Sequence, residues 1–239
     1  MSDESRIPTD ALLVEQGDYY RQRAPEYEDW WFRRDRYNRG QEANARWFAE
    51  AAEVMAALER FGPRGKVLEL ACGTGIWTRE LARSARRLTA IDGSEEMLAL
   101  NRAKVEDPTV EYIHADLFQW EPAETYDVCF FGFWLSHVPE VRFEPFWEMV
   151  RRALEPEGRV FFLDSARNER ASAIDHKLPE AGEETMLRRL KNGEEFQIVK
   201  RFHEPESLQD RLAGLGWSVQ VKSTPEYFIY GGGSPAASA

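Results

Sequence analysis

The chain has 239 residues, 43% of them hydrophobic, which is enough to bury one substantial core and fits one domain better than two. Its 42 acidic and 31 basic residues give a net charge of −11, which disfavours a nucleic-acid partner because the phosphate backbone is bound mainly through Lys and Arg. There is no apolar export signal, no run of ~18 apolar residues that could span a membrane, and too few cysteines for a disulfide framework. We expect a cytoplasmic protein that acts on a small molecule and has no membrane partner, and the sequence leaves a homodimer open.

The first quarter of the chain is predicted to be helical. Residues 1–10 and the tail 233–239 are small and polar and cannot offset their ordering entropy by burial, so both ends are predicted to be flexible. Residues 11–61 have helical patterns with several aromatic residues. We interpret them as a helical lid within a single domain that covers residues 11–232.

From Lys66 onward, short β-branched or aromatic runs alternate with helical patterns, which is typical of a parallel sheet with crossover helices. The predicted strands are KVLEL (66–70), RLTAID (87–92), VEYIHAD (110–116), YDVCFFG (126–132) and RVFFLDS (159–165). The helices between them are expected at 77–85, 94–104 and 142–154. Glu157-Gly158 is interpreted as the stop signal of the last of these helices.

The end of the chain has a different pattern. A helix near 206–215 is followed by strands at 217–224 and 226–232, and so short a link between strands joins only antiparallel neighbours. The expected fold is therefore α/β and Rossmann-like, with seven mostly parallel strands and an antiparallel C-terminal strand. This arrangement argues against a plain dinucleotide dehydrogenase.

Residues 167–204 lie outside this core and contain a hairpin signal. Asn192-Gly193 is a two-residue turn between a first arm at 185–191 and a second at 194–202. We interpret the segment as an inserted β-hairpin that serves, with the N-terminal helices, as a lid over the carboxyl ends of the strands, where open α/β sheets bind ligands.

The segment VLELACGTGIWT (67–78) is the strongest functional signal. A buried strand ends on Glu69 and Leu70, and a glycine-containing turn then leads into a helix, which lets the backbone approach a ligand and points a helix N-terminus at it. Dinucleotide sites place GxGxxG here. In this chain Ala71 replaces the first glycine, an acid precedes the turn, and no third glycine follows at that spacing.

Acidic residues end the next two strands. Asp92, 23 positions after Glu69, can accept hydrogen bonds from both hydroxyls of a ribose, and Asp116 ends the third strand. Aspartate in such a place also caps helices and turns, and one alone would support either interpretation. Three acids at consecutive strand ends, in register with a glycine turn, predict a nucleotide-type cofactor site.

Glu69 to Gly75 resembles motif I of the class I S-adenosylmethionine-dependent methyltransferases, which allows Ala at the first glycine. The resemblance implies S-adenosylmethionine as cofactor, with Glu69 at its methionine end and Asp116 and the Leu117 amide at its adenine. No metal is expected, because no spacing of metal ligands is visible. Core packing would explain Tyr20 and Met97 about as well as cofactor contact does. The predicted cofactor residues are Tyr20, Arg23, Glu69, Ala71, Gly73, Thr74, Gly75, Asp92, Gly93, Met97, Asp116, Leu117 and Gly132.

FFGFWLSHVPE (130–140) resembles the motif IV region of the same family, where backbone carbonyls face the sulfonium. His137 is placed there as a catalytic base or a substrate contact, although a single histidine before Pro139 can equally be structural. Methyl transfer is an in-line displacement that depends on alignment and desolvation. It needs a base only if the acceptor carries a proton, whereas an anionic acceptor needs cations.

Over most of its length the chain resembles the bacterial phosphonate O-methyltransferase type of small-molecule enzyme, through YYRQRAPEYE (19–28), ADLFQW (115–120), FQIVKRF (196–202) and LGWSVQV (215–221). In that type a lid tyrosine and a lysine bind the acidic group, which implies Tyr37 and Lys200 as substrate residues beside Phe133 and His137. Phe133 and the inserted WWFRRDRYNRG (30–40) depart from the pattern. The alternative interpretation of Lys200 is an exposed strand lysine that does not contact the substrate.

Three other functions stay open at this point. The acceptor atom could be carbon or nitrogen, as in methylation of an aromatic compound, a quinone or an amine. A non-catalytic S-adenosylmethionine-binding module would share motif I. A nicotinamide dehydrogenase would share the fold, but no Tyr-x-x-x-Lys set is evident behind the glycine turn.

Overall fold

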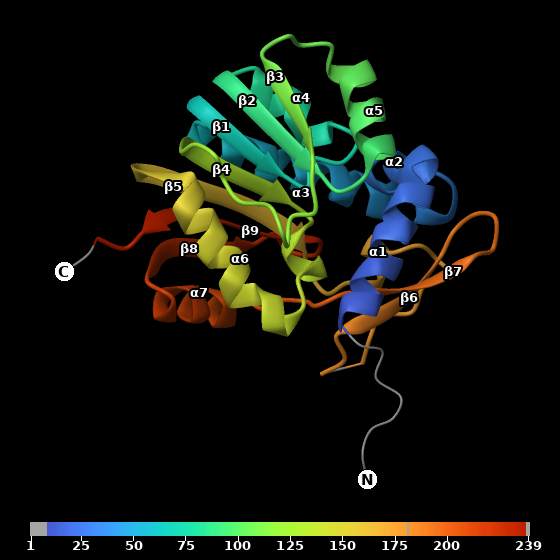
Figure 1. Cartoon of the computed structure of the whole chain (residues 1–239). Helices are drawn as coiled ribbons and strands as arrows, with labels where there is room; N and C mark the ends of the chain where they lie inside the picture. The colour runs from blue at the N-terminus through green and yellow to red at the C-terminus, as the bar shows by residue number, and fades with distance from the viewer. Residues whose placement is uncertain (1–8, 181, 238–239) are drawn as a thin grey trace.

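A seven-stranded sheet forms the centre of the computed structural model, which describes residues 9–180 and 182–237 (Figure 1). Its strand order is β3-β2-β1-β4-β5-β9-β8. The strands are β1 (Gly65–Leu70), β2 (Ala85–Asp92), β3 (Val110–His114), β4 (Tyr126–Gly132), β5 (Leu154–Ser165), β8 (Trp217–Ser223) and β9 (Phe228–Pro235). The first five pair in parallel, and β9 is antiparallel to both β5 and β8. The predicted α/β fold is confirmed, with the antiparallel strand inside the sheet and β8 at its edge.

Helices cover both faces of the sheet because the strand residues are apolar on both sides. On one face, α3 (Gln41–Phe61), α4 (Ile76–Ala82) and α5 (Glu95–Val105) pack on Phe130 and its neighbours. On the other face, α6 (Glu140–Ala153) and α7 (Pro205–Gly214) pack on Phe131 and its neighbours. Successive residues of β4 therefore belong to two different cores.

The remaining elements lie outside the central sheet and its covering helices, and the helices and strands among them are at the right of Figure 1. They are α1 (Thr9–Arg23), α2 (Tyr27–Trp31), the short 3-10 turns η1 (Ala24–Glu26), η2 (Asp35–Tyr37), η3 (Leu135–His137) and η4 (Glu169–Ala171), and the hairpin of β6 (Thr185–Arg189) and β7 (Glu195–Val199). The hairpin packs on α1 through a small core of Tyr19, Met186, Leu190 and Ile198. The predicted inserted hairpin is confirmed. The residues predicted as a helical lid, 11–61, lie in two places. α1 packs on the hairpin, whereas α3 covers a face of the sheet.

Several predicted boundaries are wrong. Glu157-Gly158 does not stop a helix, because β5 begins at Leu154, immediately after α6, and its pairing with β4 shifts register between Leu154 and Arg159. A Cβ on Gly158 would lie 2.8 Å from the carbonyl oxygen of Glu155, so the strand needs glycine at this irregularity. The hairpin turn has three residues, because the amide of Leu190 donates to the carbonyl of Glu194 at 2.9 Å.

The ends are more ordered than the composition suggests. β9 runs to Pro235, so the prediction of a flexible tail is wrong for residues 233–235, and Gly233 pairs with both Val160 and Val219. A Cβ on Gly233 would lie 2.0 Å from the Ser218 carbonyl oxygen, so the apparent linker glycines are needed for close strand packing. α1 begins at Thr9, inside the predicted flexible end. Residues 1–8 and 238–239 lie outside the described residues.

Three further observations on the described residues concern membrane spans, metal sites and cysteines. None of their helices is both long and apolar enough to cross a bilayer. Nowhere in residues 9–180 and 182–237 do three His, Cys, Asp or Glu side chains gather as metal ligands would. Cys72 and Cys129 are free and buried.

Candidate functional site

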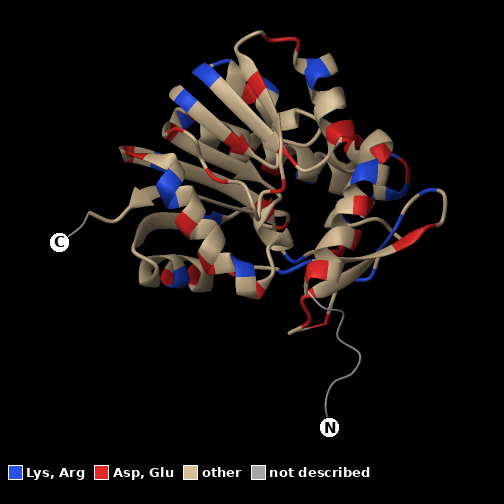
Figure 2. Ribbon diagram, viewed as in Figure 1, with Lys and Arg blue, Asp and Glu red and all other residues tan. Residues whose placement is uncertain are grey.

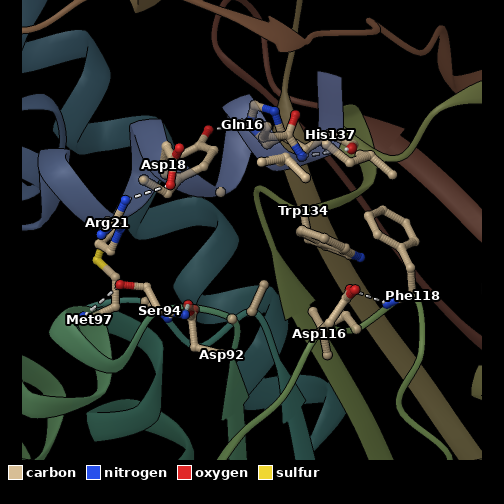
Figure 3. Close-up of a pocket in the computed structure, with 18 of the residues that line it drawn as sticks. Gln16, Asp18, Arg21, Asp92, Ser94, Met97, Asp116, Phe118, Trp134 and His137 are labelled. Carbon is tan, nitrogen blue, oxygen red and sulfur yellow. Dashed lines mark hydrogen bonds and ion pairs between the residues drawn. The ribbon is translucent and has the colours of Figure 1, made fainter. Parts of the chain in front are cut away.

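A cavity of about 590 Å³ lies at the carboxyl ends of β1, β2 and β4, where the strand order reverses, and α1 lies over it. Its volume is within the range of sites that hold a whole small-molecule ligand. Figure 3 shows Asp92 and Met97 on one side of the space and Trp134, Phe118 and Asp116 opposite. The predicted cofactor residues that line it are Tyr20, Ala71, Gly73, Asp92, Gly93, Met97, Asp116, Leu117 and Gly132.

The turn between β1 and α4 has an unusual backbone. Ala71, Gly73 and Gly75 all have positive φ, of 53°, 52° and 88°. For Ala71 this left-handed conformation costs about 1 kcal/mol, the kind of strain that is found at ligand sites. Asn101, fully buried on α5, holds the turn by donating from Nδ2 to the carbonyl of Gly73 at 3.2 Å. No pattern in the sequence identified Asn101 as a site residue.

Asp92 supports both of its predicted interpretations. Its Oδ2 accepts from the Gly73 amide at 2.8 Å and its Oδ1 from the Ser94 amide at 2.9 Å, so it organises the turn and the start of α5. Each carboxylate oxygen has further acceptor capacity, and the side chain lines the cavity. Burial raises the pKa of Asp92, and the two backbone amides oppose that rise.

Asp116 is mainly a turn residue in this structure. Its Oδ1 accepts from the Phe118 amide at 2.9 Å and its Oδ2 from Gln119 Nε2 at 2.6 Å. The flat apolar part of the cavity comes from its neighbours, because the rings of Phe118 and Trp134 lie 5.2 Å apart, and Trp134 Nε1 is buried without a hydrogen-bond partner. Neither aromatic residue was predicted as a site residue.

Three predicted cofactor residues lie behind the cavity wall. Glu69 is 1% exposed and its Oε2 has no partner, and burial raises its pKa to about 8. Gly75 begins α4, and a Cβ there would lie 2.5 Å from Asn101 Oδ1. The Thr74 hydroxyl donates to Glu28 Oε1 at 2.8 Å and so connects the turn to α2. None of the three lines the cavity, and their contacts hold the turn in place.

His137 lies at the edge of the cavity with both ring nitrogens engaged. Nδ1 is 2.7 Å from the Val199 carbonyl oxygen, so Nδ1 donates and Nε2, 2.7 Å from the Tyr20 hydroxyl, accepts. Burial, and after it the nearby Lys200 charge, holds the pKa of His137 well below its usual value. Gln16 on α1 donates to the His137 carbonyl at 3.3 Å and accepts from the Val199 amide at 3.0 Å. A neutral ring with a fixed tautomer results.

A second, smaller pocket of about 40 Å³ adjoins the first. The two share four lining residues, which therefore mark their junction: Tyr20, Tyr27, Phe133 and His137. Three basic side chains line the smaller pocket, namely Arg23, Arg188 and Lys200, and its lining contains no carboxylate. Basic residues on the hairpin and on the segment after it are blue in Figure 2.

The two arginines of the smaller pocket are buried, and the described residues provide no counter-ion for either. Within residues 9–180 and 182–237, no Asp or Glu oxygen lies within 4.0 Å of the side-chain nitrogens of Arg23, which is 5% exposed, or of Arg188, which is 8% exposed. Lys200 has one, because its Nζ is 3.7 Å from Asp164 Oδ1, and it also donates to Ser136 Oγ at 2.8 Å. Burial lowers the pKa of Lys200 to about 8, although Asp164 opposes the shift.

Three of the four predicted substrate residues line the smaller pocket, and the fourth does not. Lys200, His137 and Phe133 line the smaller pocket, and Phe133 has a positive φ of 57°. Tyr37 lines neither pocket, and reaches the site only through its hydroxyl, which accepts from Arg23 Nη2 at 3.2 Å. Arg23, predicted as a cofactor residue, lies on the side of the smaller pocket.

Arg188 was not predicted, although its position carried a signal. The residues of β6 alternate between exposed and buried, with Met186 and Arg188 on the buried side, and Leu190 just after the strand continues the pattern. Charged side chains are rarely buried unless they are paired, so an arginine on the apolar face of a hairpin strand indicates a binding partner.

The larger cavity suits S-adenosylmethionine. Asp92 offers paired acceptors for ribose hydroxyls, and Leu117, Met97 and the two aromatic rings offer an apolar slot for a base. The left-handed backbone at Gly73 lets main chain approach the ligand closely, since no side chain projects there.

Residues 67–158 match the family described as "Methyltransferase domain". A solved DhpI complex with S-adenosylmethionine (SAM) and HEP is 40% identical, covers 96% of this chain and 100% of its own, and has a TM-score of 0.77.

Two curated relatives match over less of their length. The demethylmenaquinone methyltransferase of Lysinibacillus sphaericus (strain C3-41) is 30% identical over 112 residues, which are 45% of this chain and 47% of that protein. The ubiquinone biosynthesis O-methyltransferase of Cronobacter sakazakii (strain ATCC BAA-894) is 30% identical over 164 residues, 67% of this chain and 60% of that protein. The chain spans about half the length of the first of these relatives.

Proposed function

This chain belongs to the S-adenosylmethionine-dependent methyltransferases, and from that membership we propose that it transfers a methyl group to an oxygen atom of a small anionic molecule, a phosphonate or a carboxylate. The observation that carries the proposal is the pair of buried guanidiniums, Arg23 and Arg188, that line one small pocket without a carboxylate partner. Burying an unpaired charge costs several kcal/mol, about 3–5 when a partner is missing, so the pocket is suited to an anion that supplies the counter-charge.

The position of the pocket supports transfer rather than binding alone. It meets the cofactor cavity at Tyr20, Phe133 and His137, so a ligand in one pocket faces a ligand in the other. When bound, S-adenosylmethionine supplies an electrophilic methyl group on a positively charged sulfur. The chain's residues then need to align an acceptor oxygen with that methyl group and keep water out.

Aromatic rings close the junction against water. Trp30 and Phe133 lie edge to face with their centroids 4.6 Å apart, and Tyr27 and Tyr20 lie 6.4 Å apart on the side of α1 and α2. An ionised oxygen is already a nucleophile, so such an acceptor requires no proton removal. This agrees with the lowered pKa of His137, which makes that ring a weak base.

Methylation of a quinone-like ring at carbon or oxygen is the second candidate, and the names of the two curated relatives favour it. The first of those likenesses covers less than half of this chain. The family match ends at residue 158, before the hairpin begins. Three cations around about 40 Å³ suit a compact anion better than a large apolar ring.

A radiolabelled-methyl screen tests the proposal. The purified protein would be given labelled S-adenosylmethionine with short alkylphosphonates, short carboxylates, phenols and a water-soluble quinol. Label is expected in the methyl ester of a phosphonate or of a carboxylate. Transfer to the quinol or a phenol alone would favour the second candidate. Tight cofactor binding without transfer to any member of a broad acceptor set would favour a non-catalytic binding module.

A further inference from the structure

A histidine outside both cavities contacts one of the pocket arginines. His176 lies in the loop between η4 and β6 and is 8% exposed. Its Nδ1 is 2.8 Å from Arg188 Nη1, and its Nε2 is 3.0 Å from the Arg189 amide nitrogen and 3.3 Å from the Arg189 carbonyl oxygen. His176 lines neither pocket, so any effect on a ligand must pass through Arg188.

The contact fixes the state of the ring. A guanidinium has only donors, so Nδ1 accepts from Arg188 Nη1. The Arg189 amide also points at Nε2, and a neutral ring has only one acceptor nitrogen, so the two donors compete for it. With Nδ1 as the acceptor, the ring's one proton lies on Nε2, where the Arg189 carbonyl oxygen accepts it. Burial, and then the Arg188 charge, lowers the pKa of His176 to about 3, which agrees with a neutral ring at every ordinary pH. Arg36 and Asp175 are the other charged residues that act on it.

Arg188 depends on this contact for its direction. Its Nε is buried without a partner, and His176 is the side chain to which its Nη1 donates. The neighbouring Arg189 shows the usual alternative, because it is exposed and its Nε donates to Glu195 Oε1 at 2.9 Å. A carboxylate in the place of His176 would hold the guanidinium equally well but would neutralise it.

We propose that His176 is a positioning residue for the acceptor site, which holds the Arg188 guanidinium toward the smaller pocket while leaving its whole positive charge for an anionic acceptor. The inference rests on the acceptor class proposed above. It adds a residue that changes the affinity for the methyl acceptor without contacting that molecule. It also explains why the hydrogen-bond partner of a buried arginine is a neutral histidine.

The test measures binding of ethylphosphonate, and of acetate as the carboxylate probe, by calorimetry with S-adenosylhomocysteine at saturation. For the better-bound probe, Arg188→Gln is expected to raise the Kd at least tenfold and His176→Ala about tenfold, because each removes a charged hydrogen bond. His176→Asn retains a side-chain acceptor and should stay within about threefold of wild type, whereas His176→Asp should bind more weakly than His176→Asn because it neutralises Arg188.

A double-variant cycle separates positioning from general damage. In the Arg188→Gln background, His176→Ala should add less than about twofold, since its effect passes through the missing guanidinium. Arg189→Gln is the matched control and should change neither probe. Cofactor affinity should stay constant in all variants.

The outcomes distinguish the two proposals. If wild type binds neither probe, the anionic acceptor and this inference both fail. If wild type binds and Arg188→Gln weakens binding, but His176→Ala does not, the acceptor class stands and the positioning role is overturned. Should His176→Ala fail to fold, nitrogen-15 NMR of the wild-type ring decides, because a proton found on Nδ1 would contradict the proposed contact.

Discussion

The hydroxyl of Tyr20 lies 2.7 Å from Nε2 of His137, at the junction of the two pockets. Because Nδ1 of His137 donates to the Val199 carbonyl, Nε2 must accept, and the Tyr20 hydroxyl hydrogen points at the histidine. The phenol oxygen therefore presents only lone pairs to its other neighbours. We infer that this pair would present a fixed negative dipole to a bound sulfonium, and that it is not a proton acceptor for the substrate.

Removing the Tyr20 hydroxyl should damage both turnover and stability. Tyr20→Phe removes the fixed dipole and leaves Nε2 buried without a donor, so kcat/KM is expected to fall at least about tenfold and the free energy of unfolding by about 1–3 kcal/mol. Steady-state kinetics and urea unfolding measure the two effects. Tyr19→Phe is the control, because the Tyr19 hydroxyl is buried without a partner and its loss should be close to neutral. Equal effects of the two substitutions would contradict the role of the pair.

The charge of Lys200 should set the upper pH limit of acceptor use. Its folded pKa, lowered by burial to about 8, means that the cation is present below that pH and lost as the pH rises through it. kcat/KM for an anionic acceptor should therefore fall above about pH 8, while cofactor affinity stays nearly constant.

Two variants test this assignment of the pH limit. Lys200→Arg should move the fall to higher pH, because an arginine stays protonated. Lys200→Ala should give a low profile without the step. A step that persists near pH 8 in Lys200→Ala would assign the titration to another group.

Asp92 should determine cofactor affinity. In Asp92→Asn an amide nitrogen replaces one of two carboxylate oxygens, so the side chain loses charge and half of its acceptor capacity toward ribose. The Kd of S-adenosylhomocysteine is expected to rise about 10- to 100-fold, equivalent to one or two charged hydrogen bonds. Asp107→Asn is a suitable control, because Asp107 accepts from Thr109 on the exposed turn after α5. An unchanged Kd in Asp92→Asn would leave the carboxylate with only its turn-organising role.

Local sequence patterns identified some of the site residues, whereas residues whose contacts join segments far apart in the chain were missed. Strand-end residues such as Asp92 were found because the period of a parallel sheet brings consecutive strand ends to one edge. Arg188 and His176 were missed because their partnership depends on how a loop folds back on a hairpin, which no local pattern specifies. The start of the tail was misjudged because Gly233 looks like a linker residue, yet the Ser218 carbonyl leaves room there for glycine alone.

The connection of α2 to the glycine turn should control release of the spent cofactor. Glu28 accepts from the Thr74 hydroxyl at 2.8 Å and pairs with Lys104, which also donates to the Thr74 carbonyl at 2.6 Å. Glu28→Gln keeps the size of the side chain but removes its charge. We expect S-adenosylhomocysteine to dissociate several-fold faster, with a stability loss of no more than about 1 kcal/mol because the pair is partly exposed.

Stopped-flow displacement measures that release rate. Glu42→Gln is the comparison, because it removes a surface partner of Arg46 on α3, away from the turn. Unchanged dissociation in Glu28→Gln, with the same equilibrium affinity, would mean that another contact holds α2 over the cavity.

Glu69 offers a test of what the strand-end acid does. Its folded pKa of about 8 is raised far above the value near 4.5 of an unfolded glutamate, so the folded protein holds a proton that the unfolded chain releases. This contribution to stability is complete below about pH 4.5 and is lost as the pH rises through about 8. Glu69→Gln, which cannot ionise, should therefore gain stability relative to wild type steadily from pH 5 to 8 and keep a constant advantage above that.

Cofactor binding by Glu69→Gln distinguishes two roles for Glu69, which are contact with the ligand and support of the glycine turn. Glu69 is 1% exposed and absent from the cavity lining, so Glu69→Gln should bind S-adenosylhomocysteine within about threefold of wild type at pH 7. A loss of more than about tenfold, the size of a charged hydrogen bond, would mean that the carboxylate reaches the methionine end of the ligand after a local rearrangement. Near-wild-type binding, together with a flattened pH dependence of unfolding, would make Glu69 a buried support of the turn that Ala71 and Gly73 complete.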